Sequence, residues 1–152
     1  MRTLCLAIVP LITALLGYVL SLRFAESREF WDKFDFWHKK IKNEIAFTQN
    51  TLPEILASNG EKDVFLFKVQ EFLSCGVCSE IKYLSSEENE FLVKYLQNLG
   101  TTDKTSQLDF LNSVEADILQ YSSNADNKHK KYRPLYIKLG FLFGLIIFIL
   151  LV

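Results

Sequence analysis

Two cysteines three positions apart carry the clearest chemical signal in this sequence. Cys75 and Cys78 form a Cys-x-x-Cys pair, the spacing found in thioredoxin-like redox centres and in zinc sites. A thioredoxin-like centre places the pair at the start of a helix that follows a strand, whereas here it follows an apolar helical segment. We therefore expect two small thiols in the core at a helix end, and we keep a membrane-tethered thiol or redox protein as the alternative.

The two histidines are the other candidates for chemistry. A zinc site at the cysteine pair would need two more ligands, but His38 and His129 each stand alone in the sequence. The sequence also contains no glycine-rich phosphate loop, no Gly-x-Ser-x-Gly and no His-Glu-x-x-His. We expect a protein that is not an enzyme and binds no cofactor, in which His38 is packed and hydrogen-bonded on an apolar helical face.

The elements that must position these residues follow from the distribution of charge. Of the 35 charged residues (17 basic plus 18 acidic), 34 lie within residues 23–138, while residues 3–22 and 139–152 carry none. A helix over residues 4–22 would be about 28 Å long, close to the thickness of a hydrocarbon core. We predict transmembrane helices at 4–22 and 135–152, with a helical domain at 23–134. A cleaved signal peptide is the alternative for the first run, although no small-x-small cleavage site follows it.

Basic residues next to the apolar runs predict the topology. Arg23 and Arg28 follow the first run, and a basic cluster precedes the second one. By the positive-inside rule we expect the domain in the cytoplasm and both termini outside. The cluster also suits anionic lipid, and a net charge of −1 gives no basic face for nucleic acid. The cluster comprises Lys128, Lys130, Lys131, Arg133 and Lys138.

Helical periodicity and few glycines and prolines predict an all-α domain, a bundle of about five helices between the two transmembrane helices. An apolar stripe over residues 24–52 indicates one long helix, ended by Pro53, and residues 58–60 form a turn signal. Gly76 and Gly100 are expected to stop helices. Ser85 and Glu88 match a capping box, and Thr102 or Asp103 caps the last helix. Pro134 should kink or break the chain.

Four aromatic residues on the first long helix have two interpretations. They could pack against the other helices of the domain, or they could form an exposed patch that binds a partner, because aromatic side chains anchor many interfaces. These residues are Phe30, Trp31, Phe34 and Trp37.

The last third of the sequence resembles a known family in the order and spacing of its motifs. Leu99 and Gly100 end a capped helix, Asp103 follows three positions later, and Gln107 follows four positions after that. Glu44-Ile45, with Phe47 after it, matches a second motif near the end of the first long helix. With the two apolar ends, this pattern resembles the stage III sporulation protein AB family of endospore-forming bacteria. The segment 58–84 is shorter than is usual in that family.

The resemblance implies a membrane component of the channel complex between mother cell and forespore. Its helical domain would be similar to the cytoplasmic domains of platform proteins in type II secretion and type IV pilus systems. By that analogy it would sit in the mother-cell membrane around the forespore, take no small-molecule substrate, and dock the secretion-type ATPase, stage III sporulation protein AA, beside other channel subunits. A structural stalk of an unrelated membrane complex is the remaining alternative.

Overall fold

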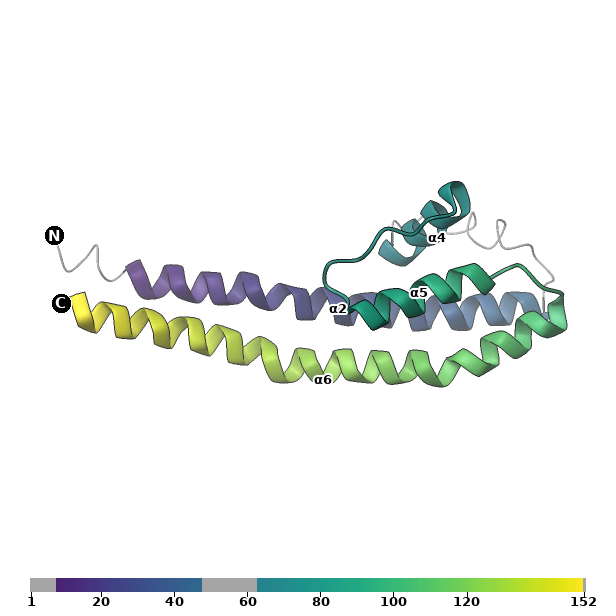
Figure 1. Cartoon of the computed structure of the whole chain (residues 1–152). Coiled ribbons are helices and arrows are strands. Elements are labelled where there is room, and N and C mark those ends of the chain that lie inside the picture. Colours follow the sequence, from purple (N-terminus) through teal and green to yellow (C-terminus); the bar gives the residue numbers. More distant parts are fainter. Residues whose placement is uncertain (1–7, 48–62, 152) are drawn as a thin grey trace. The chain divides into compact units, whose positions relative to one another are not determined.

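The computed structural model describes residues 8–47 and 63–151 of the chain (Figure 1). The elements in these ranges are the helices α2 (Ile8–Phe47), α4 (Val64–Cys75), α5 (Ser86–Asn98) and α6 (Lys104–Leu151). No strand occurs within the two described ranges, so the predicted all-α class is confirmed there. The predicted helix end at Pro53 and the predicted turn at 58–60 lie outside the described residues.

The predicted number of helices, about five between two terminal transmembrane helices, is wrong for the described residues, which form four helices in all. The number is smaller because the helices at both ends of the domain continue through the predicted boundaries. α2 runs for 40 residues and α6 for 48, so each joins an apolar run to a charged segment without interruption. Pro134 lies inside α6 and does not break it. A proline removes only one backbone N–H donor, and the helix formers on both sides continue the hydrogen-bonding pattern.

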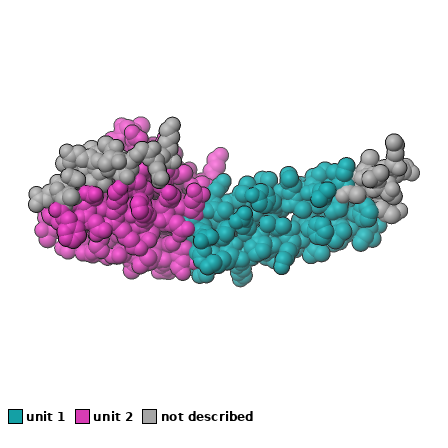
Figure 2. Space-filling model, turned by 180° about the vertical axis from the view of Figure 1, so that it is seen from behind, with its two compact units in different colours: residues 1–28, 124–152 teal, residues 29–123 magenta. Residues whose placement is uncertain are grey.

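The chain divides into two compact units, coloured separately in Figure 2. Unit 1 consists of residues 1–28 and 124–152 and contains the apolar ends of α2 and α6. Unit 2 consists of residues 29–123 and contains α4, α5 and the remaining parts of α2 and α6.

In unit 1 the two helical segments are antiparallel and meet along a glycine seam, formed by Gly17, Gly140 and Gly144. A Cβ atom on Gly17 would lie 2.5 Å from the Tyr136 carbonyl oxygen, and one on Gly140 would lie 2.5 Å from the Thr13 carbonyl oxygen. Gly144 lies against Pro10 in the same way. Gly140 and Gly144 have the Gly-x-x-x-Gly spacing that lets helix backbones touch within membranes.

Unit 2 is a helical bundle with an aromatic core. Phe34 of α2 stacks on Phe65 of α4, with 4.7 Å between ring centroids, and meets Tyr95 of α5 edge-on at 4.8 Å. Trp31 stacks on Tyr121 of α6 at 4.8 Å. All four helices therefore contribute rings to one cluster, and burial of these large side chains, together with aliphatic ones such as Ile41, Leu92 and Leu111, holds the bundle.

Candidate functional site

The corner between α5 and α6 contains four residues of the predicted family motif. Leu99 is buried, and Gly100 follows it with a φ of 77°, a left-handed conformation that glycine adopts without strain. The Gly100 N–H donates to Oε1 of Gln107 at 2.9 Å, and the Thr102 hydroxyl lies 3.4 Å from the same oxygen. Gln107 is only 3% exposed. Gln107 therefore holds the loop between α5 and α6 by accepting a hydrogen bond from its backbone.

Asp103 caps α6, as predicted. Its Oδ2 atom accepts hydrogen bonds from the backbone N–H groups of Thr105 and Ser106, at 3.2 and 3.3 Å. Hydrogen bonds from Ser106, first from its side chain and then from its backbone, hold the pKa of Asp103 below its ordinary value. The side chain therefore stays ionised near the positive end of the helix dipole, where a negative charge is favourable.

The structure brings the second motif to the same corner. Glu44 and Ile45 are half-buried on the last turns of α2, and the Lys104 ammonium donates to the carbonyl oxygen of Ala46 at 2.9 Å. The hydrogen bond joins the first turn of α6 to the end of α2, across 58 positions of sequence. Residues next to the two motifs are thus in contact at one end of the bundle, which the distance between the motifs in the sequence did not reveal.

The aromatic patch predicted as a partner surface lies in the core instead. Phe30, Trp31, Phe34 and Trp37 are each 3% exposed or less, so the structure supports the packing interpretation and contradicts an exposed patch. The Trp37 indole N–H donates to Asp63 Oδ2 at 3.1 Å, which ties α2 to the residue that caps α4. Phe36, between these residues, points the other way and is 57% exposed.

The cysteine pair lies at a helix end, as predicted, but not in the core. Cys75 is the last residue of α4 and is exposed, and Cys78 is half-buried in the following loop. Gly76 ends the helix with a φ of 70°, and its N–H donates to the Phe72 carbonyl oxygen at 2.8 Å. Both thiols are free. Burial raises the pKa of Cys78, which keeps that thiol protonated.

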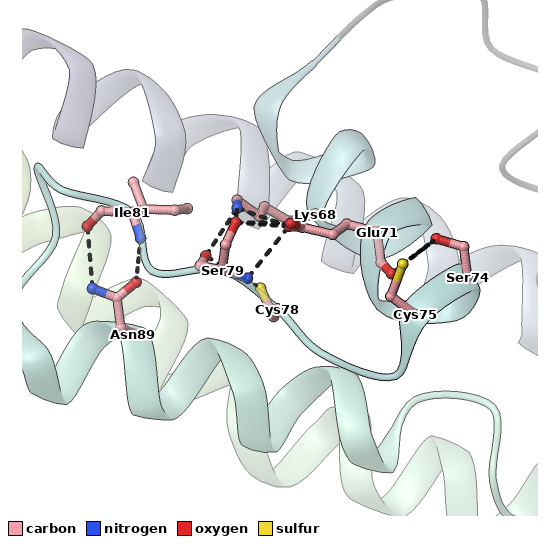
Figure 3. Close-up of polar contacts among 8 residues, drawn as sticks. All are labelled: Lys68, Glu71, Ser74, Cys75, Cys78, Ser79, Ile81 and Asn89. Atoms are coloured by element: carbon pink, nitrogen blue, oxygen red, sulfur yellow. Dashed lines mark hydrogen bonds and ion pairs between the residues drawn. The ribbon is translucent and has the colours of Figure 1, made fainter.

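A polar network beside the cysteines holds the loop against α4 (Figure 3). The Lys68 ammonium, which is almost fully buried, pairs with Glu71 at 2.8 Å and also donates to the backbone and side-chain oxygens of Ser79. The Ser79 hydroxyl donates to Glu71 at 2.8 Å. Sequence reasoning missed this network. The only signal was a lysine among the apolar positions 65–69 of the helix.

His38 is packed and hydrogen-bonded, as predicted. It is fully buried, and its Nδ1 atom lies 3.2 Å from the Tyr95 hydroxyl. Burial lowers the pKa of His38, although the nearby Glu115 carboxylate acts in the opposite direction. In the described part of the chain no three His, Cys, Asp or Glu side chains gather as metal ligands, and His38 is not brought to the cysteines.

The basic cluster belongs to unit 1. Lys130 and Arg28 both pair with Asp126, and Arg133 lies 3.1 Å from Nε2 of His129. Lys128, Lys131 and Lys138 are exposed, and the Lys131 ammonium sits 5.4 Å from the centre of the Tyr132 ring. The whole cluster therefore lies on α6, and its ion pair through Asp126 reaches Arg28 of α2.

Within the described residues one helix is long and apolar enough to cross a membrane, Lys104–Leu150, although two such helices were predicted. Most of the apolar run of α6 is exposed. Residues 4–7 of the predicted first span lie outside the described range. In the rest of that span the large apolar side chains are exposed as well.

The comparisons with known proteins give one finding. The family model of stage III sporulation protein AB matches residues 68–152, which is more than half of the chain. No match was found among curated proteins or solved structures.

Proposed function

The chain belongs to the stage III sporulation protein AB family, and we propose that it is a non-enzymatic membrane platform of the channel between mother cell and forespore. In this proposal both apolar ends cross the mother-cell membrane around the forespore. The bundle of unit 2 lies in the cytoplasm, where it docks the ATPase known as stage III sporulation protein AA beside other channel subunits. The family and the all-α architecture support the proposal.

The single observation that carries the membrane part is the surface of the hairpin in unit 1. Large apolar side chains are exposed all around it, including Leu11, Leu15 and Val19 on α2 and Leu142, Ile146 and Leu150 on α6. Such a surface is unfavourable in water and favourable in lipid. The glycine seam supplies the backbone contact that joins helices inside a bilayer, where the hydrophobic effect does not draw them together.

The docking proposal is tested with the full chain in lipid nanodiscs and the purified ATPase. We expect binding at micromolar concentration or tighter, because a subunit of a shared complex must associate at cellular concentrations. Empty nanodiscs and nanodiscs with an unrelated two-span protein serve as controls. Equal retention of the ATPase on all three samples would contradict the docking role.

The thiol alternative remains because Cys75 is exposed. Its test is the double variant Cys75→Ser, Cys78→Ser in the sporulating host. Under the platform proposal spore yield stays at the wild-type level, since serine replaces both thiols with little change in volume. A loss of spores with normal protein abundance would favour thiol chemistry instead.

A further inference from the structure

We propose that Arg23 and Tyr136 form a headgroup site for an anionic phospholipid at the charged end of the hairpin. The inference rests on the membrane placement proposed above. It adds a specific lipid contact, made by one residue from each helix, to the diffuse attraction expected of a basic cluster.

The first argument is the level at which these residues lie. Arg23 is the first charged residue after the uncharged run 3–22, and Lys138 is the last before the uncharged run 139–152. Arg23 Nη2 donates to the Tyr136 hydroxyl oxygen at 3.2 Å, so the two boundaries lie at the same height of the hairpin. In a bilayer this height corresponds to the headgroup layer, where tyrosine and arginine side chains are favoured.

The second argument is the geometry of the guanidinium. It lies 4.8 Å from the centre of the Phe24 ring and 5.7 Å from the centre of the Tyr136 ring, which holds its plane in place. The hydrogen bond to a neutral phenol does not itself compensate the positive charge of Arg23, and no carboxylate of the described residues is paired with it. The Tyr136 hydroxyl accepts in that bond, so its own proton is available for a phosphate oxygen.

The third argument is the surroundings of the site. The Phe24 ring contacts the rings of Tyr132 and Tyr136, with 5.5 Å between centroids in each pair, and Lys131 lies over Tyr132. Two cations therefore flank one aromatic cluster, directly above exposed apolar helix surface. A phospholipid fits both features of this surface. Its phosphate can meet the cations, since the arginine guanidinium suits phosphate oxygens, and its acyl chains can lie on the apolar helix surface. A free phosphate would use only the polar part.

The test uses the full chain in nanodiscs of equimolar phosphatidylcholine and phosphatidylglycerol, with native mass spectrometry of the lipids that remain bound. We expect the wild type to retain phosphatidylglycerol preferentially. Arg23→Gln should lower that preference about tenfold, and Tyr136→Phe severalfold, because each removes a donor to phosphate. Tyr132→Phe is the matched control and should stay within about twofold of the wild type.

Three outcomes would overturn the site. Equal preference in the wild type, Arg23→Gln and Tyr136→Phe would mean that the basic cluster attracts lipid without a defined site. Displacement of the lipid by millimolar inorganic phosphate would identify a free anion as the ligand. Failure of the wild type to enter nanodiscs would remove the membrane placement together with the site. If the first outcome is found in samples that insert well and bind the ATPase, it would overturn the lipid site but leave the membrane placement and the docking role intact.

Discussion

Gln107 is the residue on which the corner between α5 and α6 depends most. One buried amide oxygen accepts the N–H of Gly100, whose left-handed conformation turns the chain toward α6. Only the oxygen of this amide is paired, since the buried Nε2 of Gln107 has no hydrogen-bond partner among the described residues, so the bond to Gly100 is the contact that offsets the cost of burying the side chain. This pairing gives the motif a structural role in the described structure.

Substitution of Gln107 should destabilise the chain more than substitution of an exposed glutamine. Gln107→Ala leaves the Gly100 N–H without its acceptor, for which we expect a loss of about 1–3 kcal/mol in the free energy of unfolding. Gln97→Ala, at an exposed position of α5, is the control and should cost less than about 0.5 kcal/mol. Chemical unfolding in nanodiscs measures both, and equal effects would contradict the role given to this hydrogen bond.

His38 should make the stability of the bundle depend on pH. Burial lowers its pKa in the folded state below the ordinary value of 6.5, so the unfolded chain binds a proton first as the pH falls. The stabilising contribution of the neutral ring is thus complete above about pH 6.5, and it is lost as the pH falls from there to the folded pKa. The measurement is the unfolding free energy as a function of pH in a His129→Gln background, since the pKa of His129 is lowered too.

The matched variant for this prediction is His38→Gln in the same background. It should be less stable overall, because it loses the contact with Tyr95, but its pH dependence in this window should be flatter. The carboxylates of Asp35 and Glu115 and the ammonium groups of Lys39 and Lys42 act on His38, so each must stay unchanged. An unchanged slope in His38→Gln would assign the pH dependence to other groups.

At the scale of elements, the capping of α5 gives the sharpest local test. Ser85 accepts from the Glu88 N–H at 3.2 Å, and the Glu88 carboxylate accepts from the Ser85 N–H at 2.6 Å. Ser85→Ala should cost about 1 kcal/mol of unfolding free energy. Ser86→Ala, one position later and exposed, removes the same hydroxyl from the first turn without touching the cap and should be near neutral. A larger effect at Ser86 would refute the assigned cap.

Local signals of this kind were predictable from the sequence, and long-range contacts were not. Gly76, Ser85, Gly100 and Asp103 act through neighbours within a few positions, so residue type and spacing were sufficient. The burial of Trp31 depends on Tyr121, 90 positions away, and the Lys68 network depends on a loop that folds back on its own helix. Whether the first long helix continues into its apolar run could not be decided from the sequence, because a change from apolar to charged residues neither ends a helix nor shows that it continues.

At the scale of the whole molecule, the glycine seam should determine whether the hairpin closes. Gly140→Leu places a side chain where even a Cβ would lie 2.5 Å from the Thr13 carbonyl oxygen. Overpacking of this kind costs about 1–3 kcal/mol, and we expect a lower thermal unfolding temperature in nanodiscs. Phe143→Leu is the control: it also introduces a leucine, but on an exposed face of α6, and should change the unfolding temperature little. Equal effects of the two variants would argue against the seam.

The proposed topology can be checked through Cys75, which is exposed. In a Cys5→Ser, Cys78→Ser background, a membrane-impermeant maleimide should label Cys75 only after the cells are permeabilised. This result is expected because the basic residues beside both apolar runs favour a cytoplasmic bundle. Labelling from outside intact cells would place the bundle on the other side. Cys78 suits the experiment less, since it is half-buried and its pKa is raised.

The glycine seam also sets an order of events during biosynthesis. Gly17 and Gly140 are 123 positions apart (140 − 17), so the whole bundle sequence must be synthesised before the two helices can meet. Before that, the hydroxyls of Thr13 and Ser21 can already donate within α2, to the carbonyl oxygens of Pro10 and Tyr18. If α2 enters lipid as proposed, these bonds within one turn satisfy both hydroxyls before the hairpin closes. Closure of the hairpin is therefore a late step of assembly, available only to a chain whose last helix has been translated.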